Sequence, residues 1–240
     1  MEGQRLTPLR RNFAETVSSL HRVAEQIVAP ARKPDNEIAL EATPGGFGTP
    51  VFEWEGASHQ VRVEGVELVH SDGDGERRAP LQSLATAAEA VEGLLPAGTS
   101  LDTGRLEIDE SSSRALAAWY AFGAELLNLL VAEAGPGDAP TSPTLWPEHF
   151  DIAIELGAEA LGRRANYGLS PGDDLHAEPY LYVGPFTAEV SGDLWNARDF
   201  NGAELGYSEL LEAEDQRTAA MDFFITRRDA LAAITGGSDE

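Results

Sequence analysis

The sequence contains no cysteine, and Lys33 is the one lysine among 17 basic residues. Without cysteine the chain has no disulfide, thiolate metal ligand or cysteine nucleophile, which suits a reducing compartment. The N-terminal stretch MEGQRLTPLRRN lacks the apolar core of a secretory signal. We therefore expect a cytoplasmic protein.

Basic side chains are scarce beside the 41 acidic residues, and the formal net charge is −24. Binding to nucleic acid or to an anionic membrane needs a basic surface, so we expect neither as a partner. A GC-rich genome explains the preference for arginine but not the excess of acid. A halophilic origin explains both, because salt screens the repulsion among surface carboxylates. Both explanations stay open.

One segment, Ala115–Gly135, approaches the length of a membrane span. A spanning helix needs about 20 predominantly apolar residues. This segment carries Glu125, Asn128 and Glu133, and its uninterrupted apolar run covers only Ala115–Ala124. A charge near the centre of a bilayer is costly, so we predict a buried core helix.

The periodicity of apolar residues predicts an α+β fold. Glycine suggests two local features: a β-bulge at Gly65, where strand parity changes, and a loop at Pro44–Gly48 that lacks the Lys-Ser/Thr of a phosphate-binding loop. We expect one domain over residues 1–240, with a mixed or antiparallel sheet system, about four helices, an internal loop at 135–144 and a frayed tail at 236–240. Expected helices span about 8–29, 81–95, 111–134 and 216–234. Expected strands span 38–43, 51–55, 59–64, 66–70, 106–108, 149–156, 165–169 and 178–183, and a strand or turn region is expected at about 194–207.

The motif HFDIAIEL shows strict alternation. Phe150 and Ile152 begin one parity, and His149 and Asp151 the other. Because successive side chains of a strand point to opposite faces, this pattern predicts that His149 and Asp151 lie together on a polar face. In that position they would suit an acid/base pair.

A second pair of the same type follows the sequence Ser170-Pro171-Gly172-Asp173, which is typical of a type II turn. His176 and Glu178 share a parity there, and Pro179 places the strand at an edge or at its own start. Convergence of four such groups would give a divalent metal site. The predicted ligand set is His149, Asp151, His176 and Glu178.

Aromatic residues gather around these pairs, and they suit either a ligand cleft or core packing. Histidine–acid pairs also occur by chance, so the pattern favours a purely structural role over a pocket without metal or a metal site. The candidate ligand-binding aromatics are Trp146, Tyr167, Tyr180 and Tyr182.

At these residues the chain resembles an uncharacterised bacterial family, frequent in actinobacteria, known only as a domain of unknown function. Its members share a tryptophan-led HFDLA-type strand, a Y/F-G-x-SPGD turn and an EPYxY strand. The family often has a Trp/His-rich stretch where this chain has Lys33–Glu37. The resemblance implies one domain and brings no activity. The matching segments are Trp146–Ala153, Tyr167–Asp173 and Glu178–Tyr182, and more loosely Leu20–Val28 and Ala42–Pro50.

Three functions follow as hypotheses. The first is binding of an unidentified small polar molecule at the 146–183 segment, with or without a divalent metal. The second is a hydrolase that uses His149 and Asp151 as acid and base. The third is a non-catalytic interaction domain that uses the Pro179-bounded edge strand or the aromatics.

Overall fold

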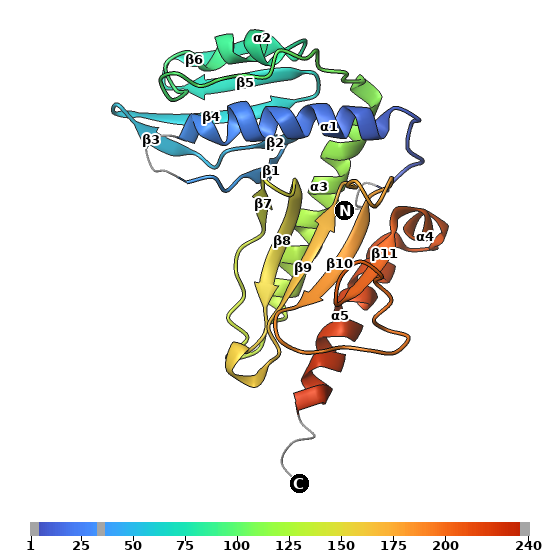
Figure 1. Ribbon diagram of the computed structural model, residues 1–240. Coiled ribbons are helices and arrows are strands. Elements are labelled where there is room, and N and C mark those ends of the chain that lie inside the picture. The colour runs from blue at the N-terminus through green and yellow to red at the C-terminus, as the bar shows by residue number, and fades with distance from the viewer. Residues whose placement is uncertain (1–4, 33–36, 236–240) are drawn as a thin grey trace. The chain divides into compact units, whose positions relative to one another are not determined.

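The computed structural model describes residues 5–32 and 37–235. Within these ranges the chain forms two antiparallel sheets and five α-helices, which confirms the predicted α+β class (Figure 1). It divides into two compact units: unit 1 comprises residues 1–6, 122–143 and 151–240, and unit 2 comprises 7–121 and 144–150. The single domain over 1–240 stays a prediction, and the expected tail at 236–240 lies outside the described residues.

Unit 2 is built on a sheet whose strand order is β1-β2-β4-β5-β6, with β3 pairing β4. The strands are β1 (Glu41–Thr43), β2 (Gly46–Gly48), β3 (Phe52–Trp54), β4 (Ala57–Glu64), β5 (Glu67–Asp72) and β6 (Gly75–Pro80). A short strand, β7 (Thr144–Trp146), joins this unit through a bridge between Leu145 and Leu40. The helical segments are α1 (Phe13–Val23), η1 (Ala24–Val28), η2 (Pro30–Arg32), α2 (Leu84–Ala88) and η3 (Glu89–Val91).

Two local predictions in unit 2 were wrong. Gly65 is not a bulge: Glu64 pairs with Glu67, so Gly65 and Val66 form the two-residue turn of a β-hairpin. Gly65 has a φ of 64°, which suits that turn. The expected loop at Pro44–Gly48 contains strand β2. Gly46 and Gly48 let the backbone of β2 lie against β4, where a Cβ atom at either position would overlap residues of β4.

Helix α3 (Glu110–Ala132) is the one helix among the described residues that is long and apolar enough to cross a membrane. The core helix of a soluble protein has the same properties. Trp119, Tyr120 and Leu127 of α3 are fully buried, as expected for a core helix. The residues of α3 up to Ala121 belong to unit 2, and those from Phe122 belong to unit 1.

Unit 1 contains four consecutive antiparallel strands in the order β11-β10-β9-β8. Strand β10 is therefore paired on both sides, and it does not offer the free edge that the interaction hypothesis used. It begins at Tyr180, two residues after the expected start at Glu178, so strand alternation does not apply to His176 and Glu178. The elements are β8 (Asp151–Leu156), η4 (Glu159–Leu161), β9 (Ala165–Ser170), β10 (Tyr180–Pro185), β11 (Ala203–Gly206), α4 (Tyr207–Glu212) and α5 (Gln216–Thr235).

The two faces of this sheet differ in polarity. On one face Ile152, Leu169 and Leu181 align across β8, β9 and β10 and are buried. Gly123 of α3 lets that helix approach Ile152 and Leu169 closely. The opposite face carries Ala153, Gly168 and the polar residues described next, so the sheet has one core face and one candidate functional face. That polar set is Asp151, Ser170, Tyr180, Tyr182 and Glu204.

Candidate functional site

Asp151 and Tyr182 meet on the polar face of the unit 1 sheet. Tyr182 pairs with Gly168, which in turn pairs with Ala153. The ring of Tyr182 lies over Gly168, where a Cβ atom would overlap it, and its hydroxyl donates a hydrogen bond to the Asp151 carboxylate. Asp151 is buried. Burial and the neighbouring Asp151 charge raise the pKa of the Tyr182 hydroxyl well above its ordinary value, so it acts as a donor.

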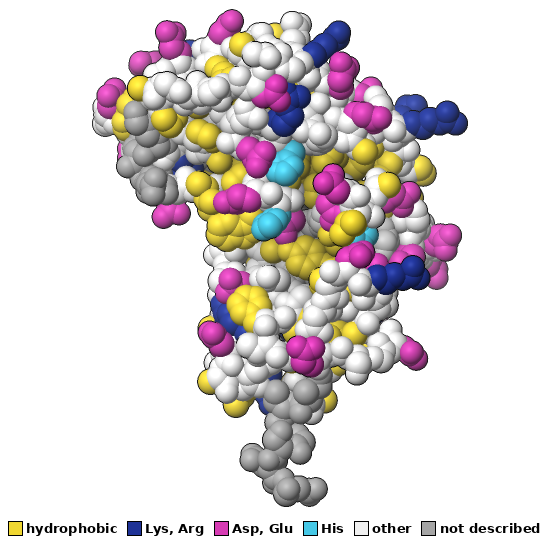
Figure 2. Space-filling view, viewed as in Figure 1, with side chains coloured by type: hydrophobic (Ala, Val, Ile, Leu, Met, Phe, Trp, Pro, Cys, Tyr) yellow, Lys and Arg dark blue, Asp and Glu magenta, His cyan; other side chains and the backbone are white. Residues whose placement is uncertain are grey.

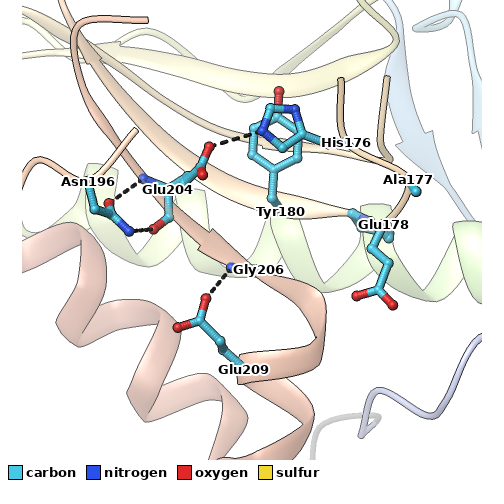
Figure 3. A pocket seen from close by; sticks show the side chains of 9 residues that line it. His176, Ala177, Glu178, Tyr180, Asn196, Glu204, Gly206 and Glu209 are labelled. Carbon is cyan, nitrogen blue, oxygen red and sulfur yellow. Dashed lines mark hydrogen bonds and ion pairs between the residues drawn. The ribbon is translucent and has the colours of Figure 1, made fainter. Parts of the chain in front are cut away.

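His176 lies at the centre of a second polar group on the same unit. Its Nε2 is 3.0 Å from Oε2 of Glu204 (Figure 3). Its Nδ1 is 3.0 Å from Oδ1 of Asp173. The hydroxyl of Tyr180 donates to Oδ2 of Asp173 at 2.7 Å, and the Tyr180 and His176 ring centroids are 4.2 Å apart. Two carboxylates and an aromatic ring thus fix the imidazole.

The charges of this group stabilise one another. Burial disfavours the imidazolium, but Asp173 and Glu204 outweigh it and raise the pKa of His176 above its ordinary value. For Asp173, burial also disfavours the charged form and so raises its pKa. Hydrogen bonds from Tyr180 and His176 more than offset this effect, so the pKa of Asp173 is lowered overall. For Tyr180, burial and then Asp173 raise the hydroxyl pKa. The group favours a charged histidine between ionised carboxylates.

A cavity of about 280 Å³ opens beside this group. Strands β10 and β11 form its floor, and the segment before β10 and the start of α4 form its sides (Figure 3). Three glutamates, Glu178, Glu204 and Glu209, contribute to its lining, against the single imidazole of His176. The lining is therefore acidic. Figure 2 shows acidic side chains spread more widely over the visible face as well.

Each carboxylate of the lining is held in place by a hydrogen bond. Glu178 accepts from the hydroxyl of Ser208 at 2.5 Å, and Glu209 accepts from the backbone N–H of Gly206 at 2.9 Å. Asn196 fixes the backbone of Glu204 through two hydrogen bonds of 3.0 Å. A carboxylate has about four lone-pair sites, so these contacts orient the groups and leave them able to accept further donors.

The two residues of the predicted acid/base pair do not lie on one strand, contrary to the prediction. His149 is exposed and lies in the turn at 147–150, because Phe150 takes a φ of 54° and β8 begins only at Asp151. Strand alternation therefore does not apply to His149. Asp151 is in the strand, and its hydrogen bond from Tyr182 comes from across the sheet.

The four predicted aromatics fall into three environments. Tyr180 lines the cavity, and Tyr182 contacts Asp151 beside it. Tyr167 is 1% exposed and packs edge-on against Phe224 of α5, so it belongs to the core of unit 1. Trp146 is 40% exposed in β7 of unit 2.

The four predicted metal ligands do not form a compact donor set. Within residues 5–32 and 37–235, the one group of three or more His, Asp or Glu with ligand atoms within 4.8 Å of one another is His59, His70 and Asp72, in unit 2. Of the predicted four, His176 and Glu178 line the cavity together, whereas Asp151 hydrogen-bonds to Tyr182.

Reasoning from sequence missed Glu204, Asn196 and Glu209 as cavity residues. The region 194–207 was expected to be a strand or turn without a fixed register, and β11 pairs Glu204 with Tyr182. A usable signal was present: Ala203 and Leu205 alternate with Glu204, the period of two that places apolar and polar side chains on opposite faces of a strand. Asp173 was assigned only to the turn.

No family model, curated protein or solved structure matches the chain.

Proposed function

We propose that the protein binds a small, positively charged polar molecule in the cavity lined by His176, Tyr180 and three glutamates. One observation carries this proposal: three glutamates with hydrogen-bonded carboxylates, Glu178, Glu204 and Glu209, line a cavity of about 280 Å³ together with a single imidazole, that of His176. Even with His176 protonated, three negative charges face one positive charge. An ammonium or guanidinium group would compensate that excess.

Tyr180 supports a cationic ligand through a second interaction. Tyr180 is part of the cavity lining, and its hydroxyl is held by Asp173. An aromatic face within about 6 Å attracts a cation, so Tyr180 can contact the ligand while the glutamates accept its N–H groups. We therefore specify the predicted small-molecule ligand as an amine or a guanidine that contacts the glutamates directly, not through a metal ion.

Ligand-observed NMR with small alkyl amines, alkyl guanidines and the corresponding alcohols tests the proposal. The cations should bind and the alcohols should not. Glu178→Gln and Glu204→Gln should each weaken binding about tenfold, because each removes a charged acceptor. Glu214→Gln is the matched control, since Glu214 is exposed on the same unit and does not line the cavity. Equal binding of amines and alcohols would overturn the proposal.

As part of the proposal, the excess of acidic residues supports a halophilic origin, and the lack of cysteine suits the reducing cytoplasm. With a net charge of −24, repulsion among carboxylates destabilises the folded chain at low ionic strength. The melting temperature should therefore rise between low salt and about molar KCl, where the screening length is roughly 3 Å. A melting temperature that does not rise with KCl contradicts the halophilic origin. Membership of the actinobacterial family likewise remains a proposal.

A further inference from the structure

A cluster of two histidines and an aspartate lies on one face of the unit 2 sheet, and the cationic-ligand proposal does not use it. In the β4–β5 hairpin His70 pairs with Val61, and the same register brings Asp72 opposite His59. Residues directly opposite each other, or two apart on one strand, share a face. His59, His70 and Asp72 therefore project to the same side, and their ligand atoms lie within 4.8 Å of one another.

The two imidazoles face each other edge to edge. Nδ1 of His59 and Nε2 of His70 are 2.9 Å apart, and the ring planes differ by only 17°. Both residues are buried, His70 at 1% exposure and His59 at 8%, and the ring of Phe52 stacks on His59. A single proton between these nitrogens satisfies both lone pairs. A metal ion is the other occupant that can do so.

The opposite nitrogen of His70 has partners for two tautomers. Its Nδ1 lies 3.2 Å from the backbone oxygen of Ala90 and 2.8 Å from Nη2 of Arg77. When Arg77 donates to Nδ1, the proton of His70 is on Nε2 and points to His59. When Nδ1–H donates to the backbone oxygen of Ala90, Nε2 carries a lone pair that points to His59 and can accept a proton or bind a metal. A backbone carbonyl that fixes the tautomer in this way is the usual outer partner of a metal-binding histidine.

We propose that His59, His70 and Asp72 bind one zinc ion. Two imidazole nitrogens and one carboxylate oxygen are ligands that zinc prefers, and three protein ligands leave a fourth position for water. Tetrahedral ligation at about 2.0–2.1 Å requires the two facing nitrogens to separate by only a few tenths of an ångström. The carboxylate of Asp72 offsets the charge of the ion.

Arg77 is the competitor of the metal. It pairs with His70 across β5 and β6, and its Nη2 lies 3.3 Å from Oδ2 of Asp72. The guanidinium thus lies against both His70 and Asp72, where a bound cation would contact them. Its side chain is half exposed, so it can turn into solvent when zinc binds. Removal of Arg77 should therefore strengthen zinc binding, which a purely structural histidine pair would not show.

Zinc titration of the full chain, followed by calorimetry and by NMR of ¹⁵N-labelled histidine rings, tests the site. One zinc ion should bind with shifts at His59 and His70. Asp72→Asn should weaken binding roughly 10–100-fold, at least the effect of losing an outer partner. Arg77→Ala should strengthen it roughly fivefold by removing a nearby positive charge. Arg78→Ala is the matched control, because the adjacent side chain points to the other face.

The outcomes separate the two sites of the protein. Asp72 is only partly buried, so its variant is expected to fold even where a substitution of His70 does not, and circular dichroism checks this. Zinc shifts at His176 without shifts at His59 and His70 would overturn the proposal. So would unchanged zinc affinity in both Asp72→Asn and Arg77→Ala.

Discussion

His176 in unit 1 and His70 in unit 2 show how one residue type acquires opposite properties. Asp173 and Glu204 flank His176 and, against burial, raise its pKa. His70 has burial as its main influence, followed by the positive charges of Arg77 and His59, and all three lower its pKa. The first cluster therefore keeps its charges in ion pairs, whereas in the second the neutral form of His70 is favoured, and its lone pair can bind a metal.

The two clusters also differ in construction. In unit 1 the contact between Tyr182 and Asp151 depends on a gap left by a glycine, Gly168. In unit 2 the cluster follows from hairpin register alone, since β4 and β5 reverse at Gly65 and bring Asp72 opposite His59. The Tyr182–Asp151 contact of unit 1 should therefore be more sensitive to a single added methyl group than the histidine cluster of unit 2.

The largest expected effect comes from Gly168→Ala. The new methyl group would overlap the ring of Tyr182 and displace its hydroxyl from the buried Asp151. Overpacking together with loss of this hydrogen bond should lower the free energy of unfolding by about 3 kcal/mol. Urea denaturation measures the change.

Gly184→Ala is the control for that substitution. Gly184 lies on β10, and a Cβ atom there has no neighbour within 4 Å. Its free energy of unfolding should stay within about 0.5 kcal/mol of the original chain. If the two glycine variants were equally stable, the proposed dependence of the unit 1 face on the glycine gap would be wrong.

A smaller effect is expected from removing single tyrosine hydroxyls in the two units. Tyr182→Phe in unit 1 removes a donor to the carboxylate of Asp151, and Tyr120→Phe in unit 2 removes a donor, at 2.7 Å, to the backbone oxygen of Phe150. Hydrogen bonds to charged groups contribute about 1.5–3 kcal/mol and neutral ones about 1 kcal/mol. Thermal or urea unfolding should therefore show the larger loss for Tyr182→Phe. The reverse order would mean that Asp151 is satisfied without Tyr182.

Much of the fold could be predicted from the sequence, because alternation and helical periodicity are local. Strands β4 and β9 and helix α5 lie close to their expected ranges. The errors arose where backbone conformation overrides the pattern. Phe150 has a positive φ, so strand β8 and its alternation begin only at Asp151. His149 therefore lies outside the strand that was predicted for it.

The sites were harder to predict, because they depend on strand pairing. The period of two placed Tyr180 and Tyr182 on one face correctly, but it carried no information that Glu204 would pair beside Tyr182. In unit 2 a bulge was predicted at Gly65, so the segments that carry His59 and His70 were expected to follow one another along one strand. The hairpin that is present brings them within 2.9 Å. A two-residue turn at Gly65 was the signal that would have revealed the cluster.

The smallest expected effect is a pH dependence of opposite sign in the two units. His176 has a raised pKa, so its stabilising contribution is complete below the unfolded value of about 6.5 and is lost as pH rises through its folded pKa. His70 has a lowered pKa, so folding favours its neutral form and stability declines as pH falls below about 6.5.

Histidine-ring NMR measures both titrations in one sample. His176 should remain protonated above pH 6.5, and Glu204→Gln should lower its pKa because it removes one of the two flanking charges. His70 should stay neutral below pH 6.5, and Arg77→Ala should raise its pKa towards the ordinary value. Similar midpoints for the two histidines would contradict the contrast between the clusters. An Arg77→Ala variant without any change at His70 would show that burial alone keeps that imidazole neutral.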